Sequence, residues 1–204
     1  MFQLIFKIRN AFRKYPGGGP DKGWGTADQG GSGIIGILVL VVVAGLIWGL
    51  WKMFDSGSET ANIQDIATKT KGYMGGRNGY DFTSGTTMTG YFIQRGLAPS
   101  GMKVVGDKTS GSATLWNTWG GQVVLAPVSS GAGVNTGFSI TTNKVPQEDC
   151  ISFVKQFGTG FFSEISINST VHSDGEVTSE EGGRECTQDT GSNGNNTLIF
   201  TKNG

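Results

Sequence analysis

The sequence contains few of the residues from which catalytic and metal sites are usually built. Its 204 residues include one His and two Cys, which leaves no material for a zinc site of the His/Cys kind and almost none for a His-based catalytic triad. Charge is also scarce, because 16% of residues are charged and the formal net charge is zero. That balance argues against a protein that binds nucleic acid through bulk positive charge. We therefore expect no enzyme activity, no cofactor or metal, and no contact with nucleic acid.

Proline is rare, at 5 residues, whereas glycine is abundant, at 35. The glycines follow no Gly-X-Y period, which excludes collagen. Hydrophobic residues make up 36% of the chain and include 12 Phe and 5 Trp, so the chain can build a core.

One hydrophobic run determines the predicted location of the chain. The 23 residues of 29–51 carry no formal charge, and a helix needs about 20 mostly apolar residues to cross a bilayer. The alternative is a buried helix of a soluble core, which rarely lacks a polar stripe over this length. Positive side chains lie mainly before the run, which predicts that residues 1–28 stay in the cytoplasm and that the rest is exported. They are Lys7, Arg9, Arg13, Lys14 and Lys22, against Lys52 after the run.

Export would place Cys150 and Cys186 in an oxidising compartment, where two thiols are expected to pair. With two cysteines, a single intramolecular pairing exists. The chain-entropy model gives such a disulfide about 3.8 kcal/mol of stabilisation. The alternative is a pair of free, buried thiols.

Hydrophobic periodicity and turn residues predict the secondary structure. One helix is expected over 34–71, with an apolar first half and an amphipathic second half that lies on a domain. Shorter helices are expected over 86–94 and, with Pro146 in the first turn, over 146–157. Strands are expected over 121–128, 137–142, 161–168 and 197–202, and 172–196 is expected to be mostly loop.

The junction between the basic leader and the apolar run carries the most specific pattern. Gly23 precedes Trp24, and Asp28 is the fifth residue counted from Trp24. This junction resembles that of the type IV prepilins, in which a membrane peptidase cuts after the glycine and the fifth mature residue is almost always glutamate. The long leader and the Trp at the first mature position resemble the type IVb class and its conjugative thin-pilus branch.

Further segments resemble the type IVb class in the same order along the chain. They are Tyr91–Pro99, Leu115–Val123, the Val145-Pro-x-x-x-Cys150 motif and the late Cys186. The resemblance covers essentially the whole chain. It implies an α+β class and the type IV pilin fold, with a long N-terminal helix whose first half is apolar. A globular head would follow, with an antiparallel sheet and a disulfide-bounded C-terminal region.

The resemblance also implies boundaries within the chain. Residues 1–23 would be a cleaved prepilin leader. Residues 24–71 would be the N-terminal helix, with its apolar part at about 34–53, and residues 72–204 the head, with a D-region at about 150–186.

By this resemblance the chain is the major structural subunit of a type IVb pilus, a helical homopolymer assembled through its N-terminal helix. Its partners would be further copies of itself, prepilin peptidase, the pilus assembly machinery of the inner membrane and, before assembly, the membrane. The precursor would lie in the inner membrane. The mature chain would form an extracellular fibre for cell contact, adhesion, aggregation or conjugative mate-pair stabilisation.

Particular residues acquire roles from the same resemblance. The carboxylate of Asp28 would pair with the α-amine of Trp24 during assembly, because either charge alone is costly in lipid. The helix residues expected in the fibre core are Ile34, Ile35, Leu38, Val41, Val42, Leu46 and Trp48.

Two features depart from the family pattern. The fifth residue is Asp28 rather than glutamate, and the segment 29–33 contains three Gly, each of which costs about 1 kcal/mol in a helix relative to Ala. We therefore expect the start of the mature chain to be partly non-helical in the fibre.

Three other functions stay open. The chain could be a minor pilin or tip adhesin, although thin-pilus members of that kind usually carry a long extra C-terminal domain. It could be a pseudopilin of a secretion machine, against which the disulfide-bounded region argues. It could also be a membrane-anchored periplasmic binding module that never assembles, which would need neither Asp28 nor a cleavable Gly23–Trp24 junction.

A few further positions have specific expectations. Asn117, Trp119 and the following Gly pair are expected to form a turn that packs the sheet on the helix. Gly45 and Gly49 form a GxxxG pattern that would serve a helix contact or be a chance match. His172 is expected to be a solvated loop residue, and the charged cluster 180–185 a solvated face.

Overall fold

The computed structural model describes the backbone of residues 26–129, 134–157, 159–191 and 193–203, and the side chains of these residues except 26–36 and 48–58. The chain divides into two compact units, residues 1–49 and residues 50–204. The predicted leader 1–23 and the predicted cleavage site at Gly23 and Trp24 lie outside the described residues.

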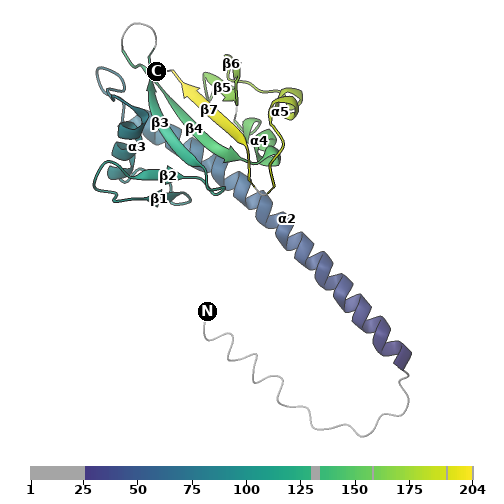
Figure 1. The fold of residues 1–204 in the computed structure, drawn as a ribbon. Coiled ribbons are helices and arrows are strands. Elements are labelled where there is room, and N and C mark those ends of the chain that lie inside the picture. The colour runs from purple at the N-terminus through teal and green to yellow at the C-terminus, as the bar shows by residue number, and fades with distance from the viewer. Residues whose placement is uncertain (1–25, 130–133, 158, 192, 204) are drawn as a thin grey trace. The chain divides into compact units, whose positions relative to one another are not determined.

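Helix α2 (Thr26–Tyr73) is a continuous α-helix of 48 residues (Figure 1). It begins earlier than the predicted 34–71 and includes the Gly-rich segment 29–33, which we expected to be partly non-helical. Extending a helix that already exists adds one hydrogen bond per residue, and this gain offsets the cost of about 1 kcal/mol for each Gly. The helix ends at Tyr73, just before the Gly75–Gly76 pair.

Residues 37–47 of α2, in the first unit, are apolar and exposed all round the helix. The exposed fraction of its large side chains runs from 44% at Val43 to 69% at Leu40. Among the residues that the structure describes, no helix has the length and hydrophobicity needed to cross a membrane. Positions 34–36 and 48–53 of the predicted apolar part lie outside the residues whose side chains are described.

The second unit contains one antiparallel sheet of seven strands in the order β1-β2-β3-β4-β7-β5-β6. The four predicted strands are confirmed with shifted ends, as β3, β4, β5 and β7. Strands β1, β2 and β6 were not predicted, because three residues are too few for a visible alternation. The bounds are β1 Lys103–Val105, β2 Thr114–Trp116, β3 Gln122–Val128, β4 Gly137–Val145, β5 Glu164–Ile167, β6 Thr170–His172 and β7 Asn196–Lys202.

Cross-strand neighbours form a buried row on one face of the sheet. Leu125 of β3 lies opposite Ile140 of β4, Ile140 lies opposite Phe200 of β7, and Phe200 lies opposite Ile165 of β5. All four side chains are buried. Because partners in register point to the same face, this row defines the face of the sheet that must be covered.

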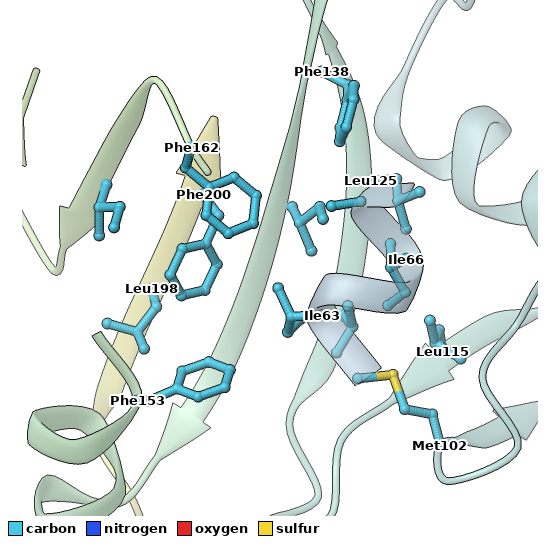
Figure 2. Packing of buried hydrophobic residues seen from close by; sticks show 14 of the residues in the cluster. Ile63, Ile66, Met102, Leu115, Leu125, Phe138, Phe153, Phe162, Leu198 and Phe200 are labelled. Carbon is cyan, nitrogen blue, oxygen red and sulfur yellow. The ribbon is translucent and has the colours of Figure 1, made fainter. Parts of the chain in front are cut away.

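The later part of α2 covers this face. Ile63 and Ile66 are fully buried and belong to one hydrophobic cluster with the strand residues (Figure 2). Ala67, one residue further along the helix, is also buried. The predicted amphipathic second half of the helix is therefore confirmed.

An aromatic cluster joins the far strands to helix α4 (Gln147–Val154). The ring of Phe200 lies 5.5 Å from that of Phe153, 4.9 Å from Phe157 and 5.0 Å from Phe162, measured between centroids. The helix is shorter than the predicted 146–157, and Pro146 is its N-cap rather than a member of its first turn. Phe157 lies beyond the helix and supplies a ring to the core.

Helix α3 (Gly85–Gln94) lies along the part of β3 that β2 does not reach. The hydroxyl of Thr89 accepts a hydrogen bond from the Leu125 N–H at 2.9 Å and donates to the Gly85 carbonyl at 2.8 Å. The Thr89 side chain therefore accepts a hydrogen bond from a backbone N–H of β3 that would otherwise donate to a neighbouring strand. Gly96, in the left-handed region with φ +69°, follows the helix as predicted.

The segment predicted as mostly loop contains helix α5 (Ser179–Glu185). Two of its seven residues are Gly, which has low helix propensity. The segment therefore shows no helical pattern of hydrophobic residues, and the helix was not predicted. A capping box stabilises its start, because Thr178 accepts from the Glu181 N–H while the Glu181 carboxylate accepts from Thr178.

Truncating Phe200 tests the aromatic cluster. We expect Phe200→Ala to lower the free energy of unfolding by about 3–5 kcal/mol, because it removes a fully buried ring and leaves a cavity. The measurement is urea unfolding of the detergent-solubilised chain. Val171→Ala is the matched control, since Val171 is 57% exposed, and a loss for Phe200→Ala no larger than the control's would contradict the packing described.

Candidate functional site

The predicted disulfide between Cys150 and Cys186 is present, and it joins helix α4 to the end of α5. Cys150 and Cys186 are bonded, with their Cα atoms 5.9 Å apart and 36 positions apart in sequence. Both residues are buried, and Cys186 is the C-cap of α5. The bond therefore encloses strands β5 and β6 and helix α5 within one covalent loop.

The buried side-chain amide of Asn196 forms hydrogen bonds that hold the segment directly after the disulfide loop in place. Its Nδ2 donates to the carbonyls of Val145 and Thr187, each at 3.0 Å. Its Oδ1 accepts from the Thr187 N–H at 2.7 Å. The side chain is fully buried, and buried amides in folded proteins normally have their donors and acceptors hydrogen-bonded, as here. Asn196 thus ties the residue after Cys186 to the end of strand β4.

Asn168 makes a second bridge in the same region. Its Nδ2 donates to the Glu185 carbonyl and to Oδ1 of Asn196, each at 3.0 Å, and its Oδ1 accepts from the Thr197 N–H at 3.0 Å. Its backbone has φ +55°, a conformation that Asn tolerates better than most residues. Sequence reasoning missed both asparagines. The one local signal was the turn-forming Asn168 between two β-branched stretches.

His172 is not a solvated loop residue, and the cluster 180–185 is not wholly a solvated face. His172 lies on strand β6, and its Nε2 is 2.7 Å from Oε2 of Glu185. The side chains are 10% and 7% exposed. Arg184 contacts the other carboxylate oxygen of Glu185 at 3.1 Å. The contact attaches the edge strand β6 to helix α5, and it joins residues 13 positions apart, beyond the reach of local patterns.

Two charged groups of this part of the chain have shifted pKa values. Hydrogen bonds from the backbone and the hydroxyl of Thr178 lower the pKa of Glu181 below its usual value. Burial, and then the charge of Lys71, lower the pKa of Lys202. The Lys202 ammonium donates to the Phe161 carbonyl and lies 4.8 Å from the centre of the Phe161 ring. Both groups serve as structural contacts.

The turn 117–121 connects α2 to the sheet, as predicted. Oδ1 of Asn117 accepts from the Gly121 N–H at 2.6 Å, and its Nδ2 donates to the Asn143 carbonyl at 2.7 Å. A Cβ at Gly121 would lie 1.8 Å from the Asn143 oxygen, so only Gly fits. The Thr118 N–H donates to Oε1 of Glu59 on α2 at 2.8 Å. Glu59 is 1% exposed.

The predicted assembly residues fall into two groups. Leu38, Val41, Val42 and Leu46 are 58–64% exposed on α2. A Cβ built at Gly45 meets nothing within 4 Å, so this half of the GxxxG pattern faces open space in the single chain. The side chains of Asp28, Ile34, Ile35 and Trp48 lie outside the described residues.

The described part of the chain contains no group of three or more His, Cys, Asp or Glu side chains that could hold a metal ion. The described residues form a head in which a helix packs on a sheet, and an exposed apolar helix segment.

Comparison with known proteins identifies relatives of this module. The family model described as PilS N terminal matches residues 54–203. The crystal structure of a type IVb pilin from Salmonella typhi is 52% identical, with a TM-score of 0.63, and the match covers 72% of this chain and 99% of that one. The NMR structure of type IVb pilin (PilS) from Salmonella typhi is also 52% identical, with a TM-score of 0.52, covering 74% and 97%. A comparison with curated proteins found no match.

Removing the disulfide tests its contribution to stability. We expect the double variant Cys150→Ser, Cys186→Ser to lose about 3.8 kcal/mol of unfolding free energy, because the unfolded chain regains the entropy of a closed loop. Urea unfolding with and without reductant measures the effect. Reductant should destabilise the wild type by a similar amount and leave the double variant unchanged. Equal stability of wild type and variant would contradict the prediction.

Proposed function

Because the chain belongs to the PilS family of type IVb pilins, we propose that it is the major subunit of a type IVb pilus, polymerising through its N-terminal helix into an extracellular fibre. Family membership makes the chain a structural subunit of a pilus. The proposal adds its place as the major component, the helix as the means of assembly, and cell contact, adhesion, aggregation or conjugative mate-pair stabilisation as the use of the fibre.

The observation that carries this proposal is the uncovered apolar surface of α2. Residues 37–47 are all exposed in the single chain, and contiguous apolar patches of this kind mark surfaces that another apolar environment covers. Lipid or the equivalent helices of other copies can supply that environment, since a helix that is apolar all round has no polar face to hydrate. The helix can therefore pass from a membrane to a fibre core without losing burial.

The proposal includes maturation of the chain. Residues 1–23 act as a leader that prepilin peptidase removes between Gly23 and Trp24, and the precursor waits in the inner membrane for the assembly machinery. The mature chain then comprises the helix segment 24–71 and the head 72–204, with a D-region at about 150–186. What supports this division is the junction motif, together with the end of α2 at Tyr73.

Asp28 and Trp24 take the role of a docking pair. Cleavage creates a positive α-amine on Trp24, four residues before the Asp28 carboxylate. In an apolar fibre core each charge alone is costly, and the cost falls when the two are paired. A pair formed between neighbouring copies would fix the register at which one helix docks on the next. The apolar residues Ile34, Ile35, Leu38, Val41, Val42, Leu46 and Trp48 then line the fibre core.

Intact-mass spectrometry of protein sheared from the cell surface tests maturation and export together. We expect a mass that lacks residues 1–23 and that rises by two hydrogens on reduction, because one disulfide opens. An uncut chain confined to the membrane fraction would overturn the proposal in favour of an anchored module that does not assemble.

Replacing Asp28 tests the docking pair. We expect Asp28→Ala to reduce sheared fibres at least about tenfold, corresponding to about 1.4 kcal/mol or more per docking step, while the precursor stays in the membrane at wild-type amounts. Asp28→Glu is the matched control and should keep the fibres, since it retains the carboxylate. Electron microscopy and quantification of the sheared fraction give the readout. Normal fibres from Asp28→Ala would remove the residue from the assembly mechanism.

A further inference from the structure

Resting on the proposed function, we propose that one end of the head binds the phosphate groups of a lipid membrane surface and so gives the fibre a site of cell contact. This cationic end is defined by Lys71, Tyr73, Arg77 and Lys202. Its partner is an anionic lipid surface, held by ammonium and guanidinium groups beside one exposed aromatic ring.

Packing brings three distant segments of the chain to this end. The Tyr80 N–H donates to the Asn135 carbonyl at 2.7 Å, and the Tyr80 ring lies 5.2 Å from that of Phe138 between centroids. Phe138, near the start of β4, is the register partner of Lys202 near the end of β7 (Figure 1). The turn after α2, which carries Arg77, therefore lies at the end of the sheet where β7 finishes.

Two ammonium groups lie near each other here without an acidic partner. Burial, and after it the charge of Lys71, lower the pKa of Lys202. Among the described residues, Lys71, Arg77 and Lys202 form no ion pair. Nearby charges of the same sign disfavour the charged form of each group, and a bound anion favours it. An anion at this end would therefore offset the repulsion between the two ammonium groups.

The cationic end also has hydrogen-bond donors to spare. The Lys202 ammonium donates to the Phe161 carbonyl, and an ammonium carries three donors, so two remain. The side chains of Lys71 and Arg77 make no hydrogen bond within the part of the chain that the structure describes. Phosphate oxygens accept several charge-assisted hydrogen bonds at once, and these are stronger than neutral ones. The unused donors thus fit a phosphate group.

Acidic side chains leave this end positive. Glu164 is the register partner of Thr201, and successive strand residues point to opposite faces, so Glu164 lies on the other face from Lys202. Asp81, which is exposed and follows Tyr80, is the one carboxylate of segment 71–81. Three positive groups therefore outweigh one negative group.

The exposed ring of Tyr73 favours a lipid surface as the source of the phosphate. Tyr73 is 62% exposed and lies two residues after Lys71. Tyr has an apolar body and a polar tip, and it is enriched at the headgroup level of membranes. A free phosphate makes no use of a ring, and a single ring gives no stacking platform for the successive bases of a nucleic acid strand.

Repetition along a fibre makes a weak site effective. Each basic side chain contributes modestly to binding at an anionic membrane. A homopolymer presents the same cationic end many times, and linked sites bind far more tightly than one site alone. The contact is therefore expected of the fibre rather than of the isolated chain.

Cosedimentation of sheared fibres with lipid vesicles tests the contact. We expect fibres to bind vesicles of phosphatidylcholine that contain phosphatidic acid, and not vesicles of phosphatidylcholine alone. Lys71→Gln with Lys202→Gln should weaken this binding about tenfold or more, because two cations are lost from every copy. Binding is measured per amount of fibre, so that a change in fibre yield does not enter the result.

The matched control removes two cations from the other end of the sheet. Lys103 is the register partner of Trp116, which pairs with Gln122 at the start of β3, and Lys144 lies near the end of β4. Both lysines are exposed. Lys103→Gln with Lys144→Gln changes the net charge by the same amount and should leave vesicle binding unchanged.

A second variant covers the case in which the loss of the Lys202 contact with Phe161 disturbs the head. Lys71→Gln with Arg77→Gln alters two exposed side chains. It should weaken vesicle binding to a similar extent while fibre yield and the closed disulfide stay as in the wild type.

The outcomes separate this inference from the proposed function. If the wild type forms no fibres, the proposed function fails. If the wild type forms fibres, any of three results overturns the membrane contact alone. The first is vesicle binding that neither variant weakens more than the control. The second is full displacement of the vesicles by inorganic phosphate at the same phosphate concentration, which would indicate a site for free phosphate. The third is binding of DNA without binding of vesicles.

Discussion

The packing of the later part of α2 against one face of the antiparallel sheet is the contact on which the head depends. The sheet presents rows of apolar side chains, including Leu125, Ile140 and Phe200, that cannot face water without a large cost. Ile63 and Ile66 supply the covering surface. Without this helix the sheet has an open hydrophobic face, and without the sheet the second half of the helix has no partner. The two elements therefore form one unit.

Buried polar contacts determine how the helix and the disulfide-bounded region sit on that core. Glu59 receives the Thr118 N–H, and Asn117 holds the same turn on strand β4. At the other end, Asn196 joins the flank of the disulfide to the end of β4. A buried polar group that loses its partner costs about 1–3 kcal/mol, whereas apolar contacts tolerate small shifts. Many positions of the helix on the sheet would bury similar apolar area. These polar groups therefore favour the one position in which their hydrogen bonds form.

The same helix shows two ways of covering an apolar surface. Its later part packs against the chain's own sheet, whereas residues 37–47 are exposed. In the proposed fibre, identical helices of other copies would cover this exposed surface.

Local patterns determined those parts of the protein whose cause is local. The exposed apolar run, the amphipathic end of α2, the helix after Pro146 and the alternating strands β3 and β4 all follow from the periodicity of neighbouring residues, and the export of a chain with two cysteines predicts their pairing. Tertiary structure alone decided the three-residue strands β1, β2 and β6, the Gly-containing helix α5, and the burial of His172 against Glu185. These elements have weak intrinsic preferences, so contacts between distant segments determine them. Asn196 shows this most clearly: its position has no local signal, and its amide becomes essential only when the chain brings Val145 and Thr187 to it.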